Sequence, residues 1–210
     1  MEIHAHVPKP GKNAMHWVLE GVFILVSVGV AFGAGEYREY RANRELAGRV
    51  LRSLQAEVEH NLAEVEPYLS IHVAWSNALM NAHPDSMSGA GIDGYVALRP
   101  PLPPSGSEFP TEVRRGAWDA ALSTGSLRLL DYDVVAALSN IYQMQQFYGD
   151  NIARVVTAGT ATTAFEPAAR ALVLRQLAID MGTVTFSERL LIGLYKQHLP
   201  AIRSAAAASQ

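Results

Sequence analysis

The sequence contains no cysteine, and this absence excludes several kinds of chemistry. Without a thiol, the chain has no disulfide, no cysteine nucleophile and no cysteine-ligated zinc or iron–sulfur centre. An excess of basic residues is missing too, because 17 Lys and Arg stand against 20 Asp and Glu, a formal net charge of −3. With no basic block and no basic patch interleaved with aromatic residues, we expect no nucleic-acid partner.

Motifs for catalysis are also missing. The sequence has no nucleophile elbow, phosphate-binding loop or zinc-hydrolase helix. The segment 89–94 matches G-x-G-x-x-G, but it lies within a Pro/Gly-rich stretch and not between a strand and a helix, so we interpret it as plain loop. His60 completes a single Glu-x-x-His sequence, and a di-iron bundle needs two. We therefore predict a protein that is not an enzyme and has no catalytic, cofactor-binding or metal-binding residues.

What the sequence does have is one long apolar run, residues 17–35, in which Glu20 is the only charged residue. As a helix, these 19 residues rise ~1.5 Å each and span about 28 Å, close to the ~30 Å hydrocarbon core of a bilayer. The run continues without a proline into a segment of alternating charge, 36–45. We predict a tail at 1–16 and a transmembrane helix at 17–36 that continues into water as a stalk.

A cleaved signal peptide is the alternative interpretation. Lys9 and Lys12 would supply its basic region, and Ala31–Gly33 offers a small-x-small cleavage site. However, Glu20 lies where an uninterrupted apolar core should begin, and the helical pattern continues past the cleavage site. The pattern favours an anchor, with the lipid bilayer as a partner.

Five residues of the anchor region are predicted to contact lipid or a partner helix. Glu20 lies about one turn inside Trp17, so its carboxylate can reach the headgroups. Gly29 and Gly33 are four residues apart and let another helix approach closely, while the ring of Tyr37 suits the membrane interface.

After the anchor, residues 37–203 read as one helical domain. Apolar residues recur at spacings of three and four from Ala47 to Leu69, which is typical of one face of a helix. The polar residues of this stretch are expected mostly off that face: Glu57, Glu59, Asn61, Glu64 and Glu66. Pro67 should kink or divide this helix, with a further helical stretch over 68–82. An exposed apolar stripe needs partners, and we expect an antiparallel helical bundle.

Four later helices are predicted from caps and breakers. Thr111 is the expected N-cap of the first, which contains Trp118 as a core anchor and ends at Gly125. Asp131 is expected to cap the second. The third covers 166–181, and the fourth covers 187–199 and stops at Pro200, leaving 204–210 as a flexible tail.

The segment 83–110 interrupts these helices. It contains six prolines and four glycines, too many breakers for a helix. Loops of this length in compact domains are usually functional or disordered. We treat it as a candidate binding surface, with an ordered loop covering one end of the bundle as the simpler interpretation.

Two stretches together resemble a known group of proteins. The anchor followed by the segment 36–45, and the sequence Ala117–Leu130 with the helix around Leu138–Tyr142, are similar to uncharacterised bacterial single-pass inner-membrane proteins. The resemblance implies an inner-membrane location and a mostly helical domain. It implies no activity and no site residues.

The side of the membrane on which the domain lies is contested. Two lysines precede the span and five arginines follow it, at 38, 41, 44, 49 and 52, which favours a cytoplasmic domain. Those arginines are interleaved with glutamates, and a short basic tail before one anchor favours an exported domain. We lean slightly to the periplasm.

Two functions from different classes remain. The first is a non-catalytic accessory or scaffold subunit of a larger membrane complex, energy-transducing complexes included, which associates with other subunits or with itself. The second is a membrane-anchored ligand-binding or sensor module that uses the segment 83–110 and the adjacent end of the bundle.

Overall fold

The computed structural model describes residues 14–82, 98–103, 105–160 and 167–209. All regular secondary structure in these ranges is helical, so the prediction of an all-α protein with a long N-terminal helix is confirmed. The chain divides into two compact units, residues 1–44 and 45–210, and each is described by itself.

The first unit consists, where it is described, of the N-terminal part of helix α1. This helix runs from Ala14 to Val65 without a break, so the apolar run does continue directly into the charged segment. Every side chain over 17–42 is exposed. In the described part of the chain, α1 is the one helix long and apolar enough to span a membrane, by length and composition.

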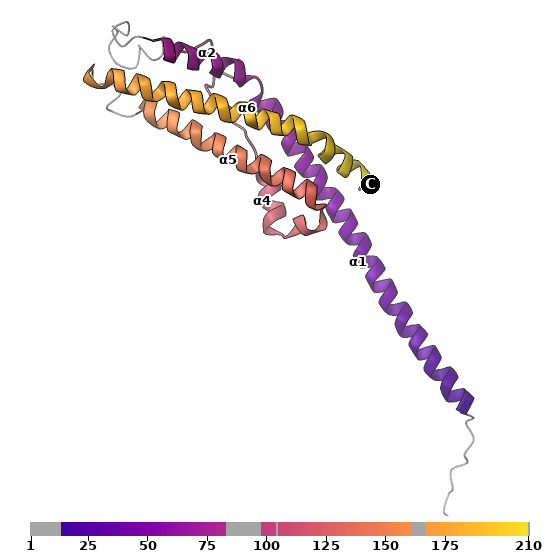
Figure 1. The fold of residues 1–210 in the computed structure, drawn as a ribbon. Helices are drawn as coiled ribbons and strands as arrows, with labels where there is room; N and C mark the ends of the chain where they lie inside the picture. The colour runs from indigo at the N-terminus through magenta and orange to yellow at the C-terminus, as the bar shows by residue number, and fades with distance from the viewer. Residues whose placement is uncertain (1–13, 83–97, 104, 161–166, 210) are drawn as a thin grey trace, which may run out of the picture. The chain divides into compact units, whose positions relative to one another are not determined.

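Where it is described, the second unit contains the remainder of α1 and four further α-helices: α2 (Tyr68–Asn81), α4 (Gly116–Ser123), α5 (Tyr132–Thr160) and α6 (Arg170–Ala208). Short 3-10 helices lie at Ser126–Leu129 and Pro167–Ala169. Helix α6 packs along both α5 and α2 (Figure 1). One continuous core joins the helices, and its fully buried members include Leu54, Val58, Leu138, Ile141, Leu191 and Ile202.

Several of the predicted helix ends are confirmed. Helix α1 ends at Val65 and α2 begins at Tyr68, so Pro67 divides the helix as expected. Gly125 follows α4 with a φ of +67°, a left-handed conformation that glycine adopts without strain. At the start of α5, Asp131 Oδ1 accepts the backbone N–H of Asp133 at 2.8 Å.

The prediction of two separate C-terminal helices is wrong, and helix α6 also includes residues 204–208 of the predicted tail. Helix α6 runs through the expected gap at 182–186, through Pro200 and on to Ala208. Ser187, the expected start of a helix, instead donates to Thr183 O within α6 at 2.9 Å. Pro200 removes one backbone donor, but Ile202 and Ala206 are 0% and 2% exposed, and their burial offsets that loss.

The last turns of α6 are also tied to α1. The Arg203 guanidinium donates to Glu59 at 2.6 Å, and this hydrogen bond holds the pKa of the Glu59 carboxyl below its usual range. Close packing continues toward the end of the helix, because a Cβ added at Gly48 would lie 2.9 Å from Ser209 O. Glycine is therefore required where α1 passes the end of α6.

We predict that Ile202→Ala lowers the free energy of unfolding by about 2–4 kcal/mol, because Ile202 is fully buried beyond Pro200. Urea titration of the full chain in detergent, followed by circular dichroism, measures the loss. The matched control is Leu190→Ala on the same helix, where the side chain is 40% exposed and the expected loss is under about 1 kcal/mol. If the two variants lost equally little free energy of unfolding, the packing of the C-terminal end of α6 would be contradicted.

The predicted loop 83–110 is only partly described, since 83–97 and 104 lie outside the described residues. Its described residues, together with 111–115, contain no regular secondary structure. Phe109 is 9% exposed and belongs to the core, so the last part of this segment packs into the helical unit.

Candidate functional site

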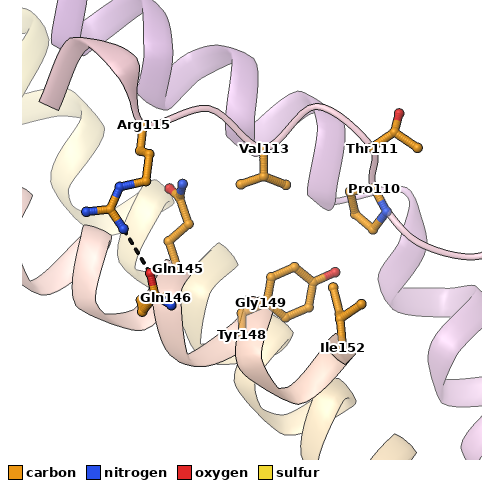
Figure 2. A pocket seen from close by; sticks show the side chains of 9 residues that line it. All are labelled: Pro110, Thr111, Val113, Arg115, Gln145, Gln146, Tyr148, Gly149 and Ile152. Carbon is orange, nitrogen blue, oxygen red and sulfur yellow. Dashed lines mark hydrogen bonds between the residues drawn. The ribbon is translucent and has the colours of Figure 1, made fainter. Parts of the chain in front are cut away.

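A groove of about 320 Å³ lies between the segment 110–115 and helix α5, and Figure 2 shows it from close by. Pro110, Thr111, Val113 and Arg115 line one side. The other side is formed by α5 residues Gln145, Gln146, Tyr148, Gly149 and Ile152. The groove is the natural candidate site because polar side chains gather there, so the partners of those side chains decide what it can do.

The groove depends on the path of residues 111–115, and here one prediction is wrong. Thr111 is not an N-cap, because α4 begins only at Gly116. The reason lies in α1, whose Asn61 is fully buried and pairs with both backbone groups of Arg114. Asn61 Oδ1 accepts Arg114 N–H at 2.7 Å and its Nδ2 donates to Arg114 O at 2.6 Å. Hydrogen bonds from the Asn61 side chain on α1 therefore take the place of the backbone hydrogen bonds that a helix would form at Arg114.

Gln145 forms the inner polar wall of the groove. Its Nε2 donates to Arg114 O at 2.8 Å, and its Oε1 accepts from Asn61 at 3.2 Å and from the Tyr195 hydroxyl at 3.0 Å. Burial raises the pKa of Tyr195, so this phenol stays protonated and donates. One amide thus joins α1, α5, α6 and the segment beside α4.

The polar side chains at the rim of the groove also have hydrogen-bond partners within the protein. Arg115 donates to the Asp119 carboxylate, with Nε 3.0 Å from Oδ2, and its Nη1 donates to Gln146 Oε1 at 2.9 Å (Figure 2). Gln146 in turn donates to Asp150 at 3.0 Å. The charge of the guanidinium is therefore balanced within the protein.

These pairings decide what the groove can do chemically. Arg115, Gln145, Gln146 and Tyr148 all have hydrogen-bond partners within the described chain. A catalytic site needs a positioned nucleophile, acid or base that is free to meet a substrate. The side chains of Gln145 and Tyr148 are instead engaged in holding the helices together.

A second polar cluster caps helix α4. Glu57 on α1 is 8% exposed, and its carboxylate accepts the backbone N–H of Ala117 at 2.8 Å and that of Trp118 at 3.2 Å. A negative charge at this position satisfies free N–H groups and favours the positive end of the helix dipole. The Tyr142 hydroxyl also donates to Glu57, at 2.6 Å, and burial raises the pKa of this phenol.

A third cluster lies fully inside the unit and contains His72, Glu188 and Tyr148. His72 Nε2 lies 2.8 Å from Glu108 O, and because a carbonyl only accepts, Nε2 carries a hydrogen. His72 Nδ1 lies 2.9 Å from Glu188 Oε2, so one proton lies between these two atoms. The Tyr148 hydroxyl donates to Glu188 Oε1 at 2.9 Å, and burial raises the pKa of Tyr148.

Either arrangement of the shared proton leaves this third cluster without net charge. Imidazolium with carboxylate and imidazole with carboxylic acid both satisfy every contact. The side chains of His72 and Glu188 are both 0% exposed. Burying such a polar pair is costly unless every donor and acceptor has a partner, and here each one does. The cluster connects α2, α5 and α6 to the segment that contains Glu108.

The predicted site residues fall in different units. Trp17, Glu20, Gly29, Gly33 and Tyr37 lie on α1 in the first unit, and all are exposed. A Cβ added at Gly29 or Gly33 would meet no described atom within 4 Å, which leaves both positions open to a partner helix.

The predicted core anchor Trp118 is confirmed. It is 8% exposed and stacks on the Tyr142 ring at a centroid distance of 4.8 Å and an angle of 18°. His60, which was not assigned to a metal, lies 3.1 Å from Glu112 O. Over the described ranges, no group of three or more His, Asp or Glu residues could hold a metal ion.

The buried polar residues were not predicted as core, although one signal was available. Glu57 and Asn61 were placed mostly off the apolar face, yet they lie three and seven positions after Leu54, on its own face. Glu188 lies four positions after the buried Val184 and three before the buried Leu191, so it too is on an apolar face. A polar residue that lies three or four positions from the apolar residues of a stripe shares their face of the helix. Such a position indicates a buried side chain that takes part in a hydrogen-bond network.

Comparison with known proteins adds no functional information. No family model, no curated protein and no solved structure matches this chain.

Proposed function

We propose that this chain is a non-catalytic, single-pass protein of the bacterial inner membrane. In this role, residues 17–36 lie in the bilayer and the second unit forms an antiparallel bundle outside it. The bundle and the span associate with other membrane subunits, or with a second copy, as an accessory or scaffold part of a larger complex.

The exposure of the apolar part of α1 carries this proposal. Leu25 is 74% exposed, and Phe23 and Phe32 are each 73% exposed. A continuous apolar surface of this size is costly in water and marks contact with lipid or protein. These side chains are exposed in the described residues, which supports lipid or a partner helix as the surface that they contact.

The chemistry of the second unit supports a structural role. Its buried polar side chains serve to connect helices, as Glu57, Asn61 and Gln145 do. In the groove beside α5, the side chains of Arg115, Gln145, Gln146 and Tyr148 are likewise paired within the described chain. A unit held in one shape by internal networks is suited to present fixed surfaces to partners.

Co-purification from native membranes tests the scaffold role. The tagged full chain, extracted in mild detergent, should be recovered with partner subunits or as an oligomer by native mass measurement. We expect Gly29→Leu combined with Gly33→Leu to reduce this recovery at least about threefold, because large side chains keep a partner helix at a distance. Gly21→Leu is the matched control, since Gly21 lies outside this pair of positions.

A monomer that brings no other protein from its membrane would contradict the scaffold role. Sidedness is measured separately, by protease treatment of sealed vesicles. A periplasmic domain predicts cleavage within 45–210 only when the protease is on the periplasmic side.

A second function, ligand binding beside the segment 83–110, is favoured by one specific observation. Arg99, Glu108 and Phe109 of this segment line a cavity between helices.

A further inference from the structure

A separate cavity of about 130 Å³ lies within the second unit. It is bounded by α2, the C-terminal part of α5, α6 and the segment that contains Arg99 and Glu108. Trp75, Arg99, Glu108 and Thr160 provide its polar lining, while Phe109, Val155 and Leu177 are part of its apolar lining. It shares none of its lining residues with the groove of Figure 2.

Two hydrogen-bond donors on the lining residues have no partner among the residues that the structure describes. The indole Nε1 of Trp75 is one, although Trp75 is only 8% exposed. The Nε of Arg99 is the other, and this atom is buried although the Arg99 side chain as a whole is 32% exposed. Buried donors are almost always paired in folded proteins, because leaving one unpaired forfeits its hydrogen bonds to water. Two such donors on the lining of one cavity favour a ligand that brings a hydrogen-bond acceptor.

The chemistry of the two donors defines that group. An indole N–H and a guanidinium N–H can only donate, so a ligand that pairs with them must bring a hydrogen-bond acceptor. The Arg99 charge is already paired, because its Nη1 contacts Glu108 Oε1. An anion would therefore add an uncompensated charge beside the Glu108 carboxylate, whereas a neutral oxygen would not.

We propose that this cavity binds a small, mostly apolar, uncharged molecule whose one polar group is a carbonyl oxygen. The oxygen accepts from Trp75 Nε1 and Arg99 Nε, and the apolar body packs against Phe109, Val155 and Leu177. About 130 Å³ is below the ~300–1,000 Å³ of drug-sized pockets, so the ligand is no larger than a single small ring. This site does not depend on the membrane role proposed above.

Titration of the full chain in lipid nanodiscs with cyclohexanone tests the proposal. The ¹⁵N-labelled indole N–H resonance of Trp75, assigned with Trp75→Phe, should move with added ketone, and that of Trp118 should not. Methylcyclohexane has a similar size and no acceptor, so it should bind about two- to tenfold more weakly. Cyclohexanecarboxylate tests the exclusion of anions and should also bind more weakly than the ketone.

Two variants separate the donors from the apolar walls. Trp75→Phe keeps an aromatic ring but removes the N–H, so ketone affinity should fall about two- to tenfold while methylcyclohexane affinity changes little. Arg99→Lys keeps a cation for Glu108 but removes Nε, so ketone affinity should again fall about two- to tenfold. This variant tests the donors independently if Trp75→Phe does not fold. Trp118→Phe is the matched control and should leave binding unchanged.

Three results would overturn the proposal. One is equal affinity for the ketone and the hydrocarbon, because the donors would then contribute nothing. Another is tighter binding of the carboxylate, which would make this an anion site. The third is a Trp75 resonance that stays in place at saturating ketone, which would mean that water alone satisfies the two donors.

Discussion

Replacing Glu188 with alanine is expected to lower the free energy of unfolding by about 3–5 kcal/mol, because it removes one partner of a fully buried pair. His72 Nδ1 and the Tyr148 hydroxyl would both lose the carboxylate that they contact at 2.9 Å. Urea denaturation of the full chain in detergent measures the loss.

Glu188→Gln is the matched control for this prediction. The glutamine amide can donate to a neutral His72 and accept from Tyr148, so every group keeps a partner. We expect this variant to lose less than about 2 kcal/mol. If alanine and glutamine cost the same, or if alanine costs under about 1 kcal/mol, the cluster does not hold the helices together in the way described.

The second large effect is expected at Glu57, where alanine should cost about 2–4 kcal/mol. Three donors lose their acceptor at once: two backbone N–H groups at the start of α4 and the Tyr142 hydroxyl. Beyond the loss of stability, hydrogen exchange at Ala117 and Trp118 should become faster, because the first turn of α4 is no longer capped.

Glu59→Ala is the matched control, because the same residue type lies on the same helix only two positions later. Its carboxylate is partly exposed and pairs with Arg203, so it should cost under about 1 kcal/mol. Unchanged exchange at Ala117 and Trp118 in Glu57→Ala would show that the cap is not formed by Glu57.

Periodicity and breakers were sufficient to predict much of the fold. The three- and four-residue spacing from Ala47 onward correctly predicts that Leu54, Val58 and Val65 are buried. Pro67 and Gly125 end helices as expected because their backbone constraints are local. Features that depend on one or two neighbouring residues can be read from sequence.

Features decided by tertiary packing were not predicted. Pro200 was expected to stop a helix, but burial of Ile202 and Ala206 beyond it outweighs the missing donor. Thr111 was expected to cap α4, but the actual cap, Glu57, lies 60 residues away from Ala117 in the sequence. Local propensity cannot include a partner that only the fold brings close.

The candidate sites show the same division. The apolar run on α1 could be identified from composition alone, and so could Trp118 as a core residue. The three polar clusters depend on contacts between residues far apart in the sequence, such as His72 with Glu188. The cavity beside Trp75 is formed by residues of α2, α5, α6 and the segment after Leu98, so only the folded chain reveals it.

The central claim is that residues 17–35 lie in lipid in the mature protein. Alkaline carbonate extraction of native membranes, followed by intact-mass measurement of both fractions, tests it most directly. We expect a chain that stays in the membrane pellet and still contains the whole apolar run. A chain in the supernatant that begins after Gly33 would contradict it, because the apolar run would then be a removed signal sequence.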